Sequence, residues 1–268
     1  MMSESATEPL LRVSGLVVGF GEHKVLDGVS IDIHPGQITC VVGPSGCGKT
    51  TLLKTSVGLV DPWYGRVHLF GVDITQVPYE DVERALLNVG VLFQNGALIN
   101  SLTVAENVAI PLEQHSGLPA ELRDRVVARK LKDVGMLYAQ NSYPPSLSGG
   151  MRKRASLARA VALDPRLLFF DEPSAGLDPP RVAELDRLFL RLRKDLDASF
   201  VIVTHDVDSV RRIADRIIFL DQGRVIFDGS LDQIDTDAPD LVREFLDPDA
   251  VHDTTRTEGT RKTEETEA

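Results

Sequence analysis

One glycine-rich segment, GPSGCGKT at Gly43–Thr50, constrains this chain more than any other part of its sequence. The apolar run ITCVVG leads into it, and a helical pattern follows from about Gly48 to Val57. Glycines at these spacings permit positive φ angles and let backbone amides approach a phosphate closely. A helix start adds a favourable potential for negative charge. Spacing and context together predict a phosphate-binding loop between a buried strand and a helix, and they disfavour a chance glycine-rich turn.

Each residue of this loop is expected to contribute to nucleotide binding. The lysine supplies a mobile charge for the β- and γ-phosphate oxygens. The threonine after it offers a hydroxyl to Mg²⁺, and the next threonine can support the α-phosphate. The predicted nucleotide-binding residues here are Gly43, Pro44, Ser45, Gly46, Cys47, Gly48, Lys49, Thr50 and Thr51.

A second apolar run, LLFFDEP, ends in two carboxylates. Asp171 is placed to hold the hydration shell of a magnesium ion at the end of a buried strand. Glu172 is placed to activate a water molecule for attack on the γ-phosphate. The alternative for Glu172 is an ordinary surface carboxylate.

The order of the patterns predicts an α/β fold. Strand patterns dominate residues 10–43, and Val29, Ile31 and Ile33 alternate with polar residues as in a half-buried strand. Helical patterns separated by prolines dominate residues 103–162. The runs RLLFFD, SFVIVTH and DRIIFL then alternate with helices, which is typical of a parallel sheet. We therefore expect a parallel-sheet core with an antiparallel start and an inserted helical segment.

Composition limits the classes of function. The net charge is −11, with 40 Asp and Glu against 29 Lys and Arg, so no nucleic acid is expected as a partner. The only two cysteines, Cys40 and Cys47, suit a reducing compartment rather than a disulfide framework. The start of the chain has no signal-peptide pattern, and no apolar run approaches the roughly 18 residues of a membrane span. A soluble chain is expected, with any membrane role arising through a partner.

The segment LSGGMRKR, Leu147–Arg154, has the composition of a second anion-binding helix start. Ser148 is a good N-cap, which would leave the amides of residues 149–151 for an anion. An apolar stripe at helical spacing comprises Met151, Ala155, Ala158 and Ala162. Another face carries Arg152, Ser156 and Arg159. Taken alone, this pattern favours an ordinary capped core helix with a solvated basic side.

The order phosphate loop, LFQN, LSGG, FFDEPSAGLD and VTHD resembles the ATP-binding-cassette (ABC) ATPase family. The resemblance implies a P-loop NTPase (RecA-like) fold, Mg²⁺-dependent ATP hydrolysis, and an ABC ATPase domain over residues 10–247. It also implies a helical subdomain inserted at about 95–163, with a disordered acidic tail at 248–268. In this family the LSGG segment, here Ser148, Gly149 and Gly150, binds ATP held by the other subunit. A second copy of the chain is therefore the implied partner in a homodimer.

Further site residues follow from the resemblance, position by position. Phe20 matches the aromatic residue that stacks on adenine, where the family more often has Tyr. Gln94 matches the glutamine that contacts Mg²⁺ and the attacking water. Asp178 matches the aspartate that links the two ATP sites. His205 matches the histidine that contacts the γ-phosphate, although a histidine after a strand is often structural. The implied catalytic set is Glu172, His205, Gln94 and Asp178, and the implied metal set is Thr50, Gln94 and Asp171.

A finer resemblance rests on FQNGAL, the methionine of LSGGM and the segment DLVREFLD. These are similar to the ATPases of Mce-type lipid transporters, including the system that maintains outer-membrane lipid asymmetry. The implied function is to power phospholipid transport from the cytoplasmic face of the inner membrane. The implied partners are a transmembrane permease and an Mce-type lipid-binding protein. A small STAS-domain subunit also occurs in related systems, and the sequence leaves its presence open.

Three alternatives compete with this interpretation. In the first alternative, the same ATPase serves a polar solute such as an amino acid or an ion. A soluble ABC ATPase of DNA repair or translation would usually carry coiled-coil insertions or two cassettes, which this sequence lacks. A phosphate-loop kinase has no need of LSGG, Glu172 and His205 in this order.

Two local hypotheses remain. The small and apolar residues 95–102, NGALINSL, are expected to form part of a groove that receives a permease helix, with ordinary packing as the alternative. Cys47 lies where helix-start amides would lower the pKa of a thiol. A small filler residue is the favoured interpretation of Cys47.

Overall fold

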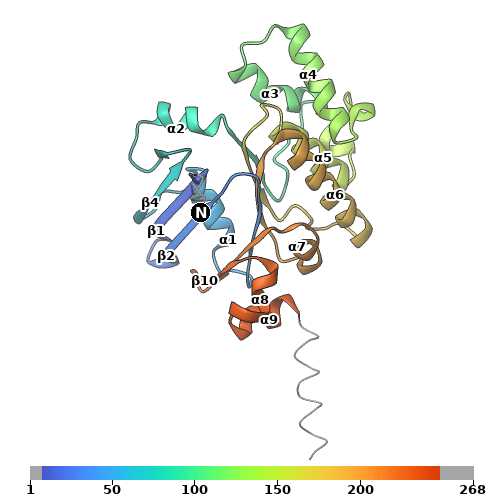
Figure 1. Cartoon of the computed structure of the whole chain (residues 1–268). Coiled ribbons are helices and arrows are strands. Elements are labelled where there is room, and N and C mark those ends of the chain that lie inside the picture. The colour runs from blue at the N-terminus through green and yellow to red at the C-terminus, as the bar shows by residue number, and fades with distance from the viewer. Residues whose placement is uncertain (1–7, 248–268) are drawn as a thin grey trace, which may run out of the picture.

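Two β-sheets meet around helix α1 (Lys49–Ser56) in the computed structural model, which describes residues 8–247 (Figure 1). Helix α1 contacts strands of both sheets. The predicted tail at 248–268 lies outside the described residues. The domain boundaries at residues 10 and 247 therefore stay predictions.

The larger sheet has six strands in the order β10-β9-β3-β8-β7-β6. Strands β9, β3, β8, β7 and β6 pair in parallel, and β10 pairs antiparallel to β9. The strands span Ile38–Val42 (β3), Val89–Leu92 (β6), Leu167–Asp171 (β7), Ser199–Val203 (β8), Arg216–Asp221 (β9) and Arg224–Gly229 (β10). The predicted parallel core is confirmed, whereas β10 was not predicted.

Each central strand of this sheet is buried on both faces. In β7, Leu168 and Phe170 pack in one apolar cluster, while Leu167 and Phe169 pack in another. Successive side chains of a strand point to opposite faces, so a continuous apolar run is what a sheet covered on both sides requires. Phe170 also packs against the ring of Phe189 from α6 (Pro179–Leu196), with centroids 4.6 Å apart.

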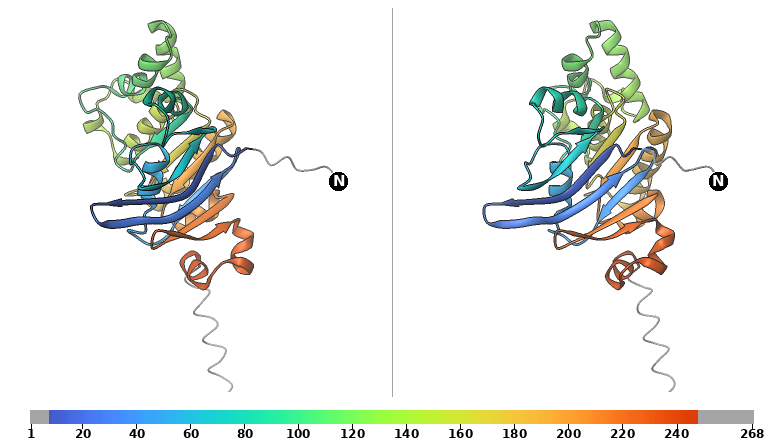
Figure 2. Two further views of the ribbon diagram at one scale, coloured as in Figure 1. Left: turned by 90° about the vertical axis from the view of Figure 1, so that its left-hand side faces the viewer. Right: turned by 60° about the vertical axis from the view of Figure 1, so that its left-hand side comes forward.

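The smaller sheet is antiparallel, in the order β2-β1-β4-β5. Its strands are β1 (Leu11–Phe20), β2 (His23–Ile33), β4 (Tyr64–Leu69) and β5 (Val72–Asp73). Figure 2 shows the long β1–β2 hairpin reaching out from the body of the molecule. Val29, Ile31 and Ile33 are buried and alternate with residues that are exposed or half-buried, so the predicted half-buried strand is confirmed.

A group of helices lies between β6 and β7 in the sequence and forms the upper part of Figure 1. It comprises α3 (Val104–His115), α4 (Ala120–Asp133), the short 3-10 helices Leu137–Ala139 and Pro144–Ser146, and α5 (Gly149–Ala160). Thr103 and Glu106 form a capping box that fixes the start of α3. The prediction that these helices form a subdomain bounded at about 95 and 163 stays a prediction.

The remaining helices flank the sheets. They are α2 (Tyr79–Leu86), α6, α7 (Val207–Ile213), a 3-10 turn at Leu231–Gln233, α8 (Ile234–Asp237) and α9 (Asp240–Leu246). Within residues 8–247, none of the helices combines the length and the apolar character needed to cross a bilayer.

Candidate nucleotide site

Four neighbouring parallel strands end at the same edge of the larger sheet, and a predicted site segment follows each of them. The phosphate loop follows β3, and Gln94, Glu172 and His205 follow β6, β7 and β8. In open α/β sheets, ligands bind beyond the carboxyl ends of the strands. The fold therefore gathers residues that are far apart in the sequence.

The phosphate loop requires its glycines. Gly43 has a φ angle of +143°, and a Cβ atom there would lie 2.0 Å from the carbonyl oxygen of Leu220. Gly48 has a φ angle of +107° and is the N-cap of α1, without a side chain to cap it. The amides that open α1 are consequently left for an anion. The predicted positive φ angles are confirmed at Gly43, Gly46 and Gly48.

Lys49 is buried and folds back onto its own loop. Its ammonium donates to the carbonyl oxygens of Gly43 and Pro44, each at 2.8 Å, and lies 3.7 Å from Cys47 Sγ. Carbonyl oxygens hold the charge inside the loop without a full counter-charge. A phosphate that enters the loop can therefore compete for this ammonium.

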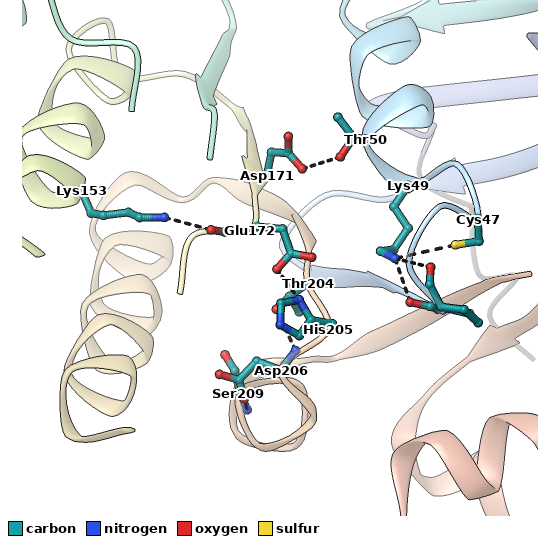
Figure 3. Close-up of polar contacts among 12 residues, drawn as sticks. Cys47, Lys49, Thr50, Lys153, Asp171, Glu172, Thr204, His205, Asp206 and Ser209 are labelled. Carbon is teal, nitrogen blue, oxygen red and sulfur yellow. Dashed lines mark hydrogen bonds and ion pairs between the residues drawn. The ribbon is translucent and has the colours of Figure 1, made fainter. Parts of the chain in front are cut away.

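The Thr50 hydroxyl donates to Asp171 Oδ1 at 2.9 Å, which joins the first turn of α1 to the end of β7 (Figure 3). Asp171 is almost fully buried. A hydroxyl and a carboxylate are hard oxygen ligands of the kind that Mg²⁺ prefers. The described residues hold no cluster of three His, Cys, Asp or Glu side chains suited to a metal. An ion at this position would therefore need further ligands from water and the nucleotide.

Glu172 adopts a strained backbone conformation. Its φ angle is +48°, in the left-handed region, which costs a non-glycine residue on the order of 1–2 kcal/mol. Its carboxylate Oε2 lies 2.8 Å from His205 Nδ1, a contact that is an ion pair when the imidazole is protonated. Oε2 is buried, and its contact with His205 is the one polar contact that it makes among the described residues. The remaining lone pairs of the carboxylate can accept a hydrogen bond from a water molecule or a substrate.

One cavity of about 380 Å³ brings half of the predicted site residues together. It is lined by Val25, Ser45, Gly46, Gly48, Lys49, Thr50, Thr51, Gln94, Glu172 and His205. Asp171 belongs to this group through its bond to Thr50. The cavity therefore contains the charge, the amides, the hydroxyls and the carboxylates that nucleotide hydrolysis requires.

The LSGG segment does not reach this cavity. Ser148 and Gly150 line a separate cavity of about 170 Å³ together with Met151, Lys153, Arg154, Leu177, Arg181, Glu184 and Leu185. Ser148 caps α5 as predicted, and its hydroxyl accepts a hydrogen bond from the Met151 amide at 3.3 Å. The amide of residue 151 is therefore occupied, which corrects the expectation that residues 149–151 would all offer free amides.

The basic side of α5 is not simply solvated, contrary to the interpretation of this segment taken alone. Arg159 donates to the carbonyl oxygens of Gly96 and Ala97, at 2.9 and 2.7 Å. Lys153 donates to the carbonyl oxygen of Glu172 at 3.0 Å, and burial lowers the pKa of its ammonium despite the charges of Glu172 and Asp171. Ser156 is buried. These side chains tie α5 to the loops after β6 and β7.

The loop after Gln94 is also held by Asn107, which sequence reasoning missed. Asn107 is fully buried in α3 and accepts a hydrogen bond from the Ile99 amide at 2.7 Å. Its amide group also donates to the carbonyl oxygens of Ile99, Leu102 and Thr103, at 2.9–3.2 Å. A polar residue inside an apolar helix was the available signal.

Phe20 and Asp178 lie outside the cavity. Phe20 ends β1, and 56% of its surface is exposed. Asp178 caps α6 by accepting a hydrogen bond from the Arg181 amide at 3.0 Å. Within one chain, Asp178 therefore has a structural role as a helix cap.

Cys47 is buried, and this burial raises the pKa of its thiol although the nearby Lys49 lowers it. The hypothesis of an activated thiol is thus wrong, and the favoured interpretation as a small filler residue fits. Cys40 is also a buried free thiol.

The fold and the cavity define a class: a phosphate-loop ATPase in which a second glycine-rich helix start lies apart from the nucleotide cavity. The family model described as ABC transporter matches residues 26–175. The chain belongs to this family and is an ABC-type ATPase.

Two curated relatives are similar over most of the chain. The first is "Intermembrane phospholipid transport system ATP-binding protein MlaF" of Escherichia coli (strain K12), 39% identical over 85% of this chain and 84% of the relative. The second is "Probable ribonucleotide transport ATP-binding protein mkl" of Mycobacterium leprae (strain TN), 38% identical over 88% of this chain and 68% of the relative.

Two solved structures share the fold. A dimeric post-hydrolysis state of the ATP-binding cassette MJ0796 bound to ADP and Pi has a TM-score of 0.76 and 28% identity, covering 82% of this chain and 98% of that one. CbiO1 from Clostridium perfringens, part of the ABC transporter complex cbiONQ, has a TM-score of 0.78 and 26% identity, covering 94% and 99%. The predicted α/β cassette fold is confirmed.

Proposed function

We propose that two copies of this chain sandwich two ATP molecules and power phospholipid transport through a membrane permease. The observation that carries the proposal is the separation of the two phosphate-binding helix starts. The loop at Gly43–Thr50 and the segment at Ser148–Gly150 line different cavities of one chain. A second copy would bring the LSGG segment against nucleotide held by the first, as the dimeric relative suggests.

Within each site, Glu172 acts as the general base. Its carboxylate accepts a proton from water as the water oxygen bonds to the γ-phosphorus and the bond to the ADP oxygen breaks. His205 lies beside Glu172 and contacts the γ-phosphate. Gln94 orients the water, and Asp178 joins the two sites across the dimer. Phe20 stacks on adenine through its exposed ring.

The phosphate loop and the LSGG segment hold the triphosphate from two sides. The phosphate loop supplies its amides and the Lys49 ammonium. The partner copy adds the hydroxyl of Ser148 and the amides of Gly149 and Gly150.

Magnesium fits the oxygen donors at the cavity. Thr50, Gln94 and, through the hydration shell, Asp171 would hold it. When bound, the ion neutralises charge on the β- and γ-phosphate oxygens. The protein supplies the Thr50–Asp171 pair, which keeps both oxygens at the mouth of the phosphate loop.

Phospholipid is the proposed cargo because of the 39% identity to a relative named for intermembrane phospholipid transport. The proposed partners are a transmembrane permease and an Mce-type lipid-binding protein, with a small STAS-domain subunit as a further candidate. The chain would lie peripherally at the cytoplasmic face of the inner membrane. A polar cargo is the competing proposal, since another relative is named for ribonucleotide transport.

Purification of the chain from membranes tests this proposal. We expect a permease, an Mce-type protein and bound phospholipid to purify with it, and phospholipid transfer between vesicles by the reconstituted complex to depend on ATP. The contrary outcome is a permease that purifies without an Mce protein and an ATPase activity that a polar solute stimulates and lipid does not. In that case the cargo would be the polar solute and not phospholipid.

A further inference from the structure

The backbone of Glu172 is held from three directions. Its amide donates to the carbonyl oxygen of Val203 at 2.9 Å, and its own carbonyl accepts from the Ala175 amide at 3.2 Å. The third contact is the hydrogen bond from Lys153 Nζ to the same carbonyl, at 3.0 Å. Lys153 is the only side chain among these three contacts, and it comes from a different element, α5 (Figure 3).

Such restraint matters because of the strained conformation of Glu172. With a φ angle of +48°, relaxation toward the common backbone regions would turn the Cα–Cβ bond and swing the carboxylate. The carboxylate now lies 2.8 Å from His205 Nδ1, at the wall of the nucleotide cavity. Strained residues persist only where their surroundings over-determine them.

We propose that Lys153 is a positioning residue for the catalytic base: its bond to the Glu172 carbonyl keeps the Glu172 carboxylate facing the nucleotide cavity. Lys153 itself does not touch the reacting atoms. This inference rests on the proposed role of Glu172 and extends it to a residue of the LSGG helix.

The position of Lys153 gives this contact a second consequence. Lys153 follows Ser148 by just over one helical turn, and both line the same cavity. The start of helix α5 therefore carries the segment that is proposed to meet the partner's nucleotide. The second turn of the same helix carries Lys153, which is proposed to orient the base of its own chain. A shift of α5 on dimer closure would reach Glu172 through the bond from Lys153.

The experiment is a double-mutant cycle on the full-length chain. Lys153→Met removes the donor and keeps most of the volume. We expect kcat to fall about tenfold with ATP affinity within twofold, because the base is misaligned while the phosphate loop is intact. In the Glu172→Gln background the same substitution is expected to change the residual rate less than twofold, since Lys153 acts through the carboxylate. Lys132→Met, an exposed lysine of α4, is the matched control.

Two results would overturn the proposal: a kcat of Lys153→Met within twofold of the parent, or an equal loss of rate with and without Glu172. The latter would indicate general damage to α5. Lys153→Gln repeats the cycle if the methionine variant is unfolded by thermal denaturation. The proposed function is tested separately by the parental ATPase activity and by its loss in Glu172→Gln. Failure of the cycle alone therefore removes the positioning role and leaves the base in place.

Discussion

The hydroxyl of Thr50 and the carboxylate of Asp171 are joined by a hydrogen bond of 2.9 Å, although 121 positions separate them in the sequence. This bond connects the helix after the phosphate loop to the strand that presents Glu172. Two oxygens of the kind that suits Mg²⁺ are therefore held next to each other by the fold.

For this pair we predict a shifted magnesium requirement. Asp171→Asn retains the shape but loses the charge that orders the hydration shell, and Thr50→Val removes the hydroxyl. We expect each to raise the Mg²⁺ concentration for half-maximal ATPase activity by about tenfold or more. A magnesium titration at saturating ATP measures this, and unchanged titrations would exclude both residues from the metal site. Removal of the ion with a chelator should abolish turnover of the parental chain.

Replacement of Glu172 by Gln should separate binding from chemistry. The amide keeps the size of the side chain but cannot take the proton, so we expect kcat to fall by about 10²–10⁴ while ATP binding persists. A closed dimer should then accumulate with ATP, as measured by size-exclusion chromatography with light scattering. Glu121→Gln, on an exposed face of α4, is the control. Hydrolysis at the parental rate by the Glu172 variant would remove it from the role of base.

We predict that Asn107 contributes strongly to the free energy of unfolding. Asn107→Ala removes the side-chain partner of the Ile99 amide and of the Leu102 carbonyl oxygen, while the carbonyl oxygens of Ile99 and Thr103 each keep one backbone hydrogen bond. We expect the free energy of unfolding to fall by about 2–3 kcal/mol in denaturant titrations, and exchange of the Ile99 amide proton to accelerate. Asn141→Ala, at an exposed turn, is the matched control and should change stability by less than about 0.5 kcal/mol. Equal effects of the two variants would contradict this account.

Thiol reactivity gives a pH-dependent prediction. Because burial raises the pKa of Cys47 above its ordinary value of 9.0, the thiol stays protonated at neutral pH, and its reactive thiolate forms only as the pH rises beyond that value. Alkylation of the native chain by iodoacetamide should therefore be slow at pH 7.5 and increase steeply above pH 9. Peptide mass spectrometry measures the modification at Cys47, and the urea-unfolded chain provides the reference rate. Native reactivity equal to that reference at pH 7.5 would show that the thiol is accessible and that its pKa is not raised.

The surface after Gln94 carries the prediction about the permease. Ile99 is 46% exposed, and Leu98 is half-buried beside it. A carboxylate in an apolar groove is poorly tolerated because it must lose its hydration. We expect Leu98→Asp and Ile99→Asp each to reduce co-purification with the permease and stimulation of ATPase activity by it. Leu59→Asp, at another exposed apolar residue, is the control. Unchanged assembly and coupling would mean that residues 95–102 serve ordinary packing.

The sequence predicted those parts of the fold and site that depend on residue type and local spacing. The apolar runs of β3, β7 and β8 needed burial on both faces, and the phosphate loop needed glycines at positive φ angles, so both were readable from residue type and spacing. Strand β10 was missed because its sequence, RVIFDG, has only a short apolar run and pairs at a sheet edge.

Contacts between segments far apart in the sequence could not be predicted from residue type and spacing. Arg159 was expected on a solvated helix face, yet it reaches the carbonyl oxygens of Gly96 and Ala97. Lys153 of the same helix reaches the carbonyl oxygen of Glu172. Only the packing of α5 against β6 brings those carbonyls within reach. The raised pKa of the Cys47 thiol likewise depends on its burial, which outweighs the lowering effect of the nearby Lys49.

The separation of the phosphate loop and the LSGG segment into two cavities has a consequence for when ATP is consumed. On the proposed arrangement, a single dissociated subunit has only half of each reaction centre, so at high dilution the rate of hydrolysis should rise with the square of the chain concentration. A permease that holds two copies side by side would replace this chance encounter by an intramolecular one, with an effective concentration that can reach the millimolar range. Subunits that are not assembled on a permease would therefore hydrolyse little ATP, and no inhibitory segment would be needed to prevent it.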